Sequence, residues 1–308
     1  MRLRVRPDRI ERLVERLQGM LQAACLPSAA AQSICGKLQF ALSWAFCRLG
    51  RGVLQPLFER QSSGSSPRWV ADEAPITEGE RLAMQFFVDF LPSMPPFAFQ
   101  VQPDGERPVL IWTDGASEPT SARPHSVGFV VAMPRAGSPA VGEGLGGLAA
   151  LREYYDVVHS SALLPPSLIA GFRPRRQQIG QVELVGALVP YLSLGERLRG
   201  RRALHWIDNS SAVAAACKGY SGAPDSARIV HALHATLAGL GVRAWFEYVR
   251  TDANVSDKPS REDLSATRYG LGECMGDSLR EELVSEPVES VLPTAAQLDG
   301  ASSYWLDM

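Results

Sequence analysis

Between residues 107 and 265, short apolar runs alternate with segments whose apolar residues recur at helical spacing. This alternation predicts five strands, at Val109–Thr113, Ser126–Met133, 154–164, Ala203–Ile207 and Val242–Val249. It also predicts helices at Ile179–Leu194, Ser210–Cys217 and Asp225–Leu240, and a last helix that begins near Val255. Strands that alternate with helices in this way are typical of a layered α/β domain.

The N-terminal third of the chain predicts helices without such strands. Apolar residues recur at helical spacing through 8–61, and a polar break rich in serine and glycine follows at 62–75. A further helix is predicted over 77–90, where Thr77 and Glu80 have the spacing of a capping box. The pattern divides the chain into a helical segment at 1–61, a linker with one helix at 62–105, an α/β domain at 106–265 and an acidic tail at 266–308, whose composition favours disorder.

Composition narrows the class of protein. The net charge of −2 gives no overall basic signature, although the first sixty residues are basic and the stretch after Glu262 is acidic. This asymmetry fits either a nucleic-acid-binding face with a solvating tail or two solvated surfaces. The five cysteines include no C-x-x-C pair, which indicates neither a disulfide framework nor a zinc knuckle. His231 and His234 lack an evident third ligand, so no zinc is expected.

No segment is predicted to cross a membrane. The most apolar N-terminal window, Ile34–Leu49, is interrupted by Lys37 and Arg48. The start of the chain has no apolar signal-peptide region. We therefore expect a soluble intracellular protein, cytoplasmic or nuclear, without a membrane partner.

Two predicted strands end in an aspartate, Asp114 and Asp208. Ligands of open α/β sheets gather at the carboxyl ends of strands, but an aspartate there also caps the turn or helix that follows. Glu183 lies on a helical face of small and apolar residues, where a glutamate is out of place unless it is paired. Asp257 falls in the first turn of the last predicted helix, where the helix dipole already favours a carboxylate.

Taken together, the four carboxylates indicate a metal site. Carboxylates that converge raise one another's pKa unless a cation neutralises them. Mg²⁺ prefers oxygen ligands, and two such ions can clamp the attacking and leaving oxygens of a phosphodiester displacement. Asp114 is the expected ligand shared by both ions.

The carboxylates lie in four segments, IWTDGAS, IGQVELVGAL, HWIDNSSA and NVSDKPSR. In this order the segments resemble the ribonuclease H domain of retroelement reverse transcriptases, and the S-R ending is most similar to DIRS-like and Ty3/Gypsy-like retrotransposons. The resemblance implies a ribonuclease H-like three-layer α/β fold with a mixed five-stranded sheet, plus an N-terminal helical segment. It implies Asp114, Glu183, Asp208 and Asp257 as catalytic, metal-binding residues, and two Mg²⁺ ions for which Mn²⁺ substitutes.

A second resemblance lies upstream. AQSICGKLQFALSWAFCRLGRGVLQPLFER is similar to the thumb or connection segment of reverse transcriptases, although a generic pair of amphipathic helices has the same pattern. No Y-x-D-D motif is present, so the chain is not expected to polymerise by itself. The implied partner is the polymerase part of a reverse transcriptase in a longer polyprotein. The loop VRTDAN lacks the histidine that cellular ribonucleases H carry there, and Tyr248 or Arg250 stands in its vicinity.

Polar residues beside the four carboxylates are candidate nucleic-acid contacts. Arginine and glutamine can contact phosphates and groove edges, and the 2′-hydroxyl distinguishes RNA from DNA. A solvated turn is the alternative for residues 175–178, and a simple helix–helix turn is the alternative for the segment after Lys218. The candidates are Gly115, Ser117, Arg176, Gln178, Asn209, Ser210, Lys218 and Asn254.

The function that follows is metal-dependent endonucleolytic hydrolysis of the RNA strand of RNA–DNA hybrids. The alternative is a catalytically inactive nucleic-acid-binding or assembly remnant of a retroelement polyprotein. The two readings differ in cleavage, not in fold.

Overall fold

The computed structural model describes residues 2–63, 75–98, 105–142, 147–175, 177–261 and 281–283. These residues fall into two compact units, which are described separately. The helical unit contains the described residues up to 98 together with 218–235, and the α/β unit contains the remainder. The predicted limits of the thumb-like segment, the linker, the nuclease-like domain and the tail stay predictions.

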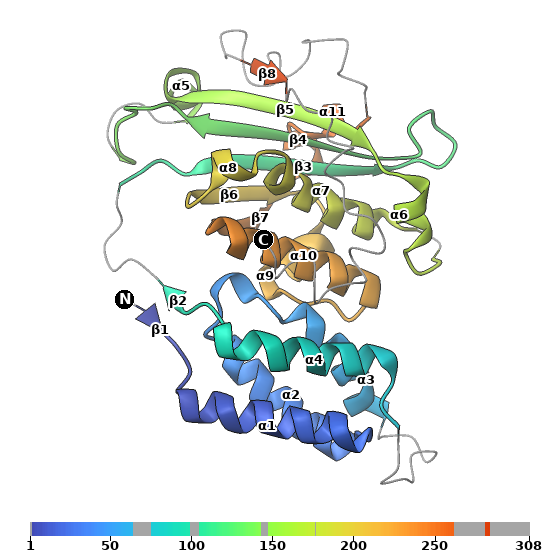
Figure 1. Ribbon diagram of the computed structural model, residues 1–308. Helices are drawn as coiled ribbons and strands as arrows, with labels where there is room; N and C mark the ends of the chain where they lie inside the picture. Colours follow the sequence, from blue (N-terminus) through green and yellow to red (C-terminus); the bar gives the residue numbers. More distant parts are fainter. Residues whose placement is uncertain are drawn as a thin grey trace. The chain divides into compact units, whose positions relative to one another are not determined.

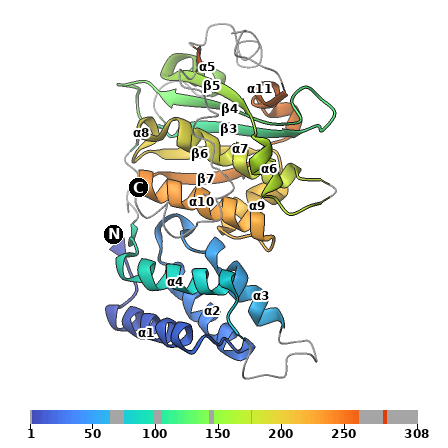
Figure 2. The ribbon, with the colours of Figure 1, turned by 45° about the vertical axis from the view of Figure 1, so that its right-hand side comes forward.

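The described part of the helical unit up to residue 98 contains the helices α1 to α4 (Figure 2). Leu13 and Leu17 of α1 and Phe87 of α4 belong to its apolar core. The predicted capping box is confirmed: the Glu80 amide donates to Thr77 Oγ1, and the Thr77 amide donates to Glu80 Oε2. The elements are β1 Arg2–Leu3, α1 Pro7–Ala23, α2 Ser28–Leu42, the 3₁₀ turns Phe46–Arg48 and Gly52–Leu54, α3 Gln55–Ser63, α4 Glu78–Ser93 and β2 Phe97–Ala98, which pairs with β1.

A buried ion pair holds α3 to the start of α4. Arg60 Nε and Nη2 donate to the two carboxylate oxygens of Glu80 at 2.6 and 2.8 Å, and each side chain is about 5% exposed or less. This bidentate geometry is the strongest that an arginine and a carboxylate can form. Glu80 therefore has its counter-ion within the chain.

The α/β unit contains the predicted mixed five-stranded sheet, in the order β5-β4-β3-β6-β7 (Figure 1). β3, β4 and β5 pair antiparallel, whereas β6 and β7 run parallel to β3. This arrangement is consistent with the ribonuclease H-like fold. The strands are β3 Val109–Ser117, β4 His125–Pro134, β5 Tyr155–Leu163, β6 Arg202–Ile207 and β7 Arg243–Tyr248.

A sixth strand extends the predicted sheet. β8, Glu281–Leu283, pairs parallel with the outer edge of β5. The sequence pattern placed these residues in the acidic tail, because three residues are too few to show an alternation. The remainder of 266–308 lies outside the described residues.

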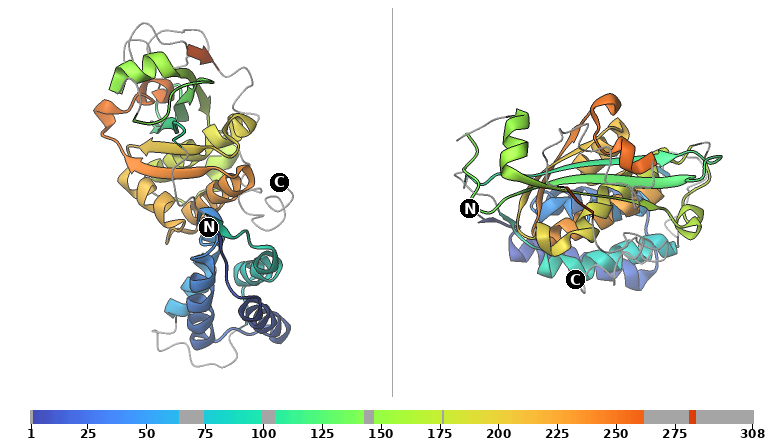
Figure 3. Two further views of the ribbon diagram at one scale, coloured as in Figure 1. Left: turned by 90° about the vertical axis from the view of Figure 1, so that its left-hand side faces the viewer. Right: turned by 90° about the horizontal axis from the view of Figure 1, so that it is seen from above.

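Helices cover both faces of the sheet, which makes three layers (Figures 1 and 3). α7 packs on β3 and β4, and α11 packs on β3, β4 and β5. Gly115 faces α7, whereas Gly128, paired with Asp114, faces α11. Neighbouring strand residues point to opposite faces, so the two helices lie on opposite sides. The helices after β2 are α5 Gly147–Tyr154, α6 Pro166–Ala170, α7 Ile179–Ser193, α8 Gly195–Leu198, α9 Ser210–Lys218, α10 Pro224–Leu240, the 3₁₀ turn Thr251–Ala253 and α11 Asp257–Arg261; residues 224–235 of α10 belong to the helical unit.

The predicted helices at 179–194, 210–217 and 225–240 are confirmed to within a residue at each end. α5 was not predicted, because its glycine- and alanine-rich sequence has no clear periodicity. Within the residues described, no helix is both long and apolar enough to cross a membrane.

Candidate metal centre

Strand register brings Asp114 and Asp208 to the same level of the sheet. The last paired residues of the parallel strands β3 and β6 are Thr113 and Ile207. Asp114 and Asp208 are the next residues along the chain, at the edge where parallel strands present their carboxyl ends. The sheet therefore delivers both carboxylates side by side.

Glu183 reaches this edge from α7, because glycines let the helix lie close to β3. A Cβ atom on Gly115 would come within 2.8 Å of the Glu183 amide nitrogen. A Cβ atom on Gly186 would come within 3.1 Å of the carbonyl oxygen of Asp114. Larger residues at either position would push the helix, and with it the carboxylate, away from the strand.

The three side chains form one group. Asp114, Glu183 and Asp208 each offer a carboxylate oxygen, and these oxygens lie within 4.8 Å of one another. Asp114 and Glu183 are buried, with 2% and 4% exposure. Glu183 Oε2 and Asp208 Oδ1 are buried without a hydrogen-bond partner. In the described part of the chain, no lysine or arginine forms an ion pair with any of the three.

Burial and mutual repulsion show in the pKa values. The pKa of Glu183 is raised to about 10, mainly by burial and also by the nearby carboxylates of Asp114 and Asp208. Burial also raises the pKa of Asp114 to about 7, with Asp208 and Asp257 acting in the same direction, while a hydrogen bond from Ser260 opposes the rise. A site that holds protons this strongly without a cation is one whose charges are unbalanced.

The capping alternative for Asp208 is not what the structure contains. Asn209 Oδ1 accepts hydrogen bonds from the amides of Ser211 and Ala212, at 3.1 Å each, and from the Ser211 hydroxyl. Asn209 is therefore the N-cap of α9, and Asp208 is not needed for that role.

The fourth predicted carboxylate lies apart from this group. Asp257 begins α11, as expected, but it is not one of the three residues whose oxygens converge. Its Oδ1 accepts a hydrogen bond from Arg261 Nε at 2.8 Å. Asp257 is still near enough to raise the pKa of Asp114, so it borders the centre.

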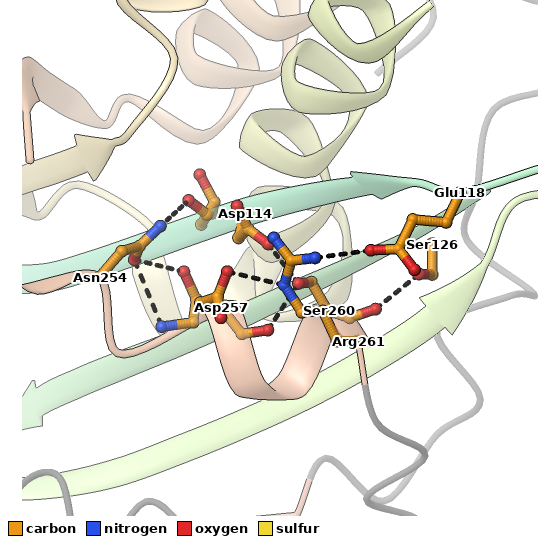
Figure 4. A network of polar contacts seen from close by, with 9 residues as sticks. Asp114, Glu118, Ser126, Asn254, Asp257, Ser260 and Arg261 are labelled. Carbon is orange, nitrogen blue, oxygen red and sulfur yellow. Dashed lines mark hydrogen bonds and ion pairs between the residues drawn. The ribbon is translucent and has the colours of Figure 1, made fainter. Parts of the chain in front are cut away.

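Ser260 was not predicted as a site residue, although it lies in the segment NVSDKPSR, one residue before its end. Its hydroxyl donates to Asp114 Oδ2, and it also lies 2.8 Å from the Asp257 carbonyl oxygen (Figure 4). The one hydroxyl proton serves only one of these acceptors at a time. The Ser126 hydroxyl donates to the Ser260 carbonyl at 2.5 Å, which fixes α11 on β4. A Cβ atom on Gly128 would meet the Ser260 amide at 2.3 Å.

A buried histidine connects the three elements that carry the carboxylates. His205 of β6 forms hydrogen bonds with Thr113 Oγ1 of β3 at 2.8 Å and with the Tyr191 hydroxyl of α7 at 3.0 Å. Its side chain is fully buried, and burial lowers its pKa to about 3, so it is a neutral hydrogen-bonding group. From sequence it was indistinguishable from any polar residue in a strand.

The predicted nucleic-acid contacts differ in environment. Ser210 and Lys218 are exposed, and Gln178 and Ser117 are half-buried. Arg176 lies outside the described residues. Asn254 is 5% exposed, and its amide donates to the Thr113 carbonyl at 3.1 Å. Asn254 therefore joins the loop before α11 to β3 next to Asp114, and its side chain is enclosed by the chain.

Gly115 is likewise buried, where it admits α7, and it is not open to a substrate. Its place after Asp114 led to the prediction of a nucleic-acid contact, and the close approach of α7 explains why glycine stands there.

In comparisons with known proteins, no family model matches the chain and no curated protein matches its sequence.

Proposed function

We propose that the chain is a ribonuclease H-type endonuclease that hydrolyses the RNA strand of RNA–DNA hybrids with the help of divalent cations. The observation that carries the proposal is the group formed by Asp114, Glu183 and Asp208, whose oxygens lie within 4.8 Å of one another. It stands at the carboxyl edge of a mixed sheet whose strand order is consistent with the ribonuclease H-like fold.

The residues present fit a hard divalent cation. All three donors are carboxylate oxygens, the ligands that Mg²⁺ and Mn²⁺ accept best. Two of the oxygens are buried and have no hydrogen-bond partner. In the described part of the chain, no lysine or arginine forms an ion pair with these three carboxylates. We propose Asp114, Glu183 and Asp208 as the main ligands, with Asp257 at the border. When bound, such cations neutralise the charge that develops on the scissile phosphate.

The chain's own residues supply position. Ser260 and the His205 network hold Asp114 and its neighbours in place, so the carboxylates are preorganised. The exposed Ser210, at the start of α9, and the half-buried Gln178, before α7, are proposed to contact the substrate backbone. Recognition of the RNA strand would use its 2′-hydroxyl groups. Lys218 remains a candidate phosphate contact.

The chain is further proposed to act beside a polymerase. The four motif segments and the thumb-like segment favour the C-terminal part of a retroelement reverse transcriptase, so the proposed partner is the polymerase part of such an enzyme. This assignment rests on the resemblance in sequence alone.

The test is cleavage of a labelled RNA–DNA hybrid with Mg²⁺ or Mn²⁺, with duplex DNA and duplex RNA as alternative substrates. The expected result is cleavage of the RNA strand of the hybrid only. Asp208→Asn should lower the rate about a thousandfold or more, with the fold unchanged by circular dichroism. The matched control is Asp156→Asn, which removes an equal charge at the opposite end of the sheet, where Asp156 pairs with Arg135.

Hybrid binding should be measured alongside cleavage. Binding without cleavage by the wild-type protein at any divalent concentration would favour the inactive remnant. Wild-type activity in Asp208→Asn would contradict the proposed centre itself.

A further inference from the structure

The fourth carboxylate, Asp257, has a counter-ion that the other three lack. Arg261 Nε donates to Asp257 Oδ1 at 2.8 Å, and Arg261 Nη1 donates to Glu118 Oε1 at 2.7 Å (Figure 4). The guanidinium therefore lies between two carboxylates beside the centre. We propose that Arg261 competes with a second divalent cation for Asp257. The Arg261 side chain must release this carboxylate before the second cation binds. This inference rests on the proposed metal centre.

The position of Arg261 supports this role. Its charge lowers the pKa of Asp114, which opposes the effects of burial and of the neighbouring aspartates. Arg261 thus acts on two of the carboxylates that a second cation would use, Asp114 and Asp257. A guanidinium and a divalent cation at this place would serve the same electrostatic purpose, so they compete.

The backbone around Arg261 is fixed, whereas the competing side chains are not enclosed. Ser260 is fully buried and joined to Asp114 and Ser126. The side chains of Asp257, Arg261 and Glu118 are 35%, 47% and 55% exposed. Release of Asp257 therefore requires rotation of the Arg261 side chain but no movement of α11.

Exposure also limits the strength of the competition. Half-exposed ion pairs contribute little net free energy, because water and salt screen them and because long side chains lose freedom in forming them. A divalent cation should displace Arg261, with an affinity lowered about fivefold by the competition. The site between Asp114, Glu183 and Asp208 has no competitor of this kind, so its affinity should be higher.

The experiment is a Mn²⁺ titration of the full chain, in which electron paramagnetic resonance measures free Mn²⁺ and gives the number and affinity of the bound ions. The wild-type protein should show a tighter and a weaker class of site. Arg261→Gln should tighten the weaker class about fivefold and leave the tighter class unchanged. Arg261→Lys keeps the charge, so its weaker class should stay closer to the wild-type affinity.

Two further variants separate competition from a general charge effect. Asp257→Asn should lose the weaker class, and adding Arg261→Gln to it should then change nothing. Arg199→Gln removes the same charge from an exposed pair with Glu196 in α8, which precedes the amino end of β6, and should leave both classes unchanged. Thermal unfolding of each variant checks that the fold is retained.

Competition by Arg261 is overturned if Arg261→Gln leaves the weaker class unchanged or weakens it, or if Arg199→Gln tightens it equally. In those cases an intact tighter class would still support the proposed centre. If the tighter class is absent from the wild-type protein, the proposed function and this inference both fail.

Discussion

Each unit of the protein buries a glutamate, and the two are treated in opposite ways. Glu80 of the helical unit receives two hydrogen bonds from Arg60 and a third from the Thr77 amide. Glu183 of the α/β unit lies beside two other carboxylates, and one of its oxygens has no partner. A buried carboxylate with its own cation is a structural element, whereas one without a cation indicates a site for something outside the chain.

The largest expected effect comes from removing the arginine that pairs with Glu80. Arg60→Met should lower the free energy of unfolding by about 3 to 5 kcal/mol, because it leaves Glu80 buried and unpaired. Denaturant unfolding measures this loss. Arg60→Met combined with Glu80→Gln should recover much of it, since the uncompensated charge is then gone. A single variant as stable as the wild type would contradict the structural role of the pair.

Glu183 has no cation of its own in the described part of the chain, so removing its charge should change the free energy of unfolding in the opposite direction. Glu183→Gln should raise the free energy of unfolding of the metal-free protein at pH 7 by on the order of 2 to 3 kcal/mol, because glutamine needs no proton in order to be buried. The folded-state pKa of about 10 lies above the value of about 4 in unfolded chains. The stability given by the protonated carboxyl is therefore complete below about pH 4 and is lost as the pH rises.

The difference between Glu183→Gln and the wild type should accordingly shrink as the pH falls from 7 toward 4. Denaturant unfolding in a chelator at several pH values measures it. Glu153→Gln, on an exposed residue of α5, is the control and should show no such trend. A Glu183→Gln protein less stable than the wild type at pH 7 would contradict an unbalanced centre.

A smaller effect should come from the spacing between α7 and β3. Gly115→Ala places a methyl group 2.8 Å from the Glu183 amide, so the helix must shift. We expect a loss of about 2 kcal/mol in unfolding free energy and weaker Mn²⁺ binding. The control is Gly180→Ala in α7. Its added methyl group would lie 3.8 Å from the Ser211 hydroxyl, so the substitution should be neutral or stabilising. Equal effects of the two substitutions would exclude close approach as the reason for Gly115.

The smallest effect concerns the hydrogen bonds that join the carboxylate-bearing elements. Tyr191→Phe should cost about 1 to 2 kcal/mol, because it leaves a nitrogen of the buried His205 without the tyrosine hydroxyl. Denaturant unfolding measures the change. Tyr220→Phe, on a half-buried tyrosine of the helical unit, removes the same hydroxyl without affecting His205 and serves as the control. No loss in Tyr191→Phe would show that His205 is satisfied in another way.

Many elements of both units could be predicted from the sequence, because their signals are local. Apolar runs such as Val109–Thr113 and the capping box at Thr77 act within a few residues. Asp114, Glu183 and Asp208 were predicted to form a group together with Asp257, and the structure brings the first three together. Their meeting in space follows from the pairing of β3 with β6.

The remainder depends on contacts between distant segments, which no local pattern reveals. Ser260 contacts Asp114 across 146 residues, and Asn254 contacts Thr113 across 141. The pairing of Asp257 with Arg261 is a local contact, but its significance depends on Glu118 and on the centre nearby. β8 is too short to be recognised, and it pairs with a strand more than a hundred residues away.

The central claim is that Asp114, Glu183 and Asp208 together hold a divalent cation. A crystal soaked in Mn²⁺ and measured at the manganese absorption edge tests it most directly. The account predicts an anomalous peak about 2.1 Å from an oxygen of each of the three side chains, and its loss in Asp208→Asn. Crystals that show no peak between these carboxylates at millimolar Mn²⁺ would contradict it.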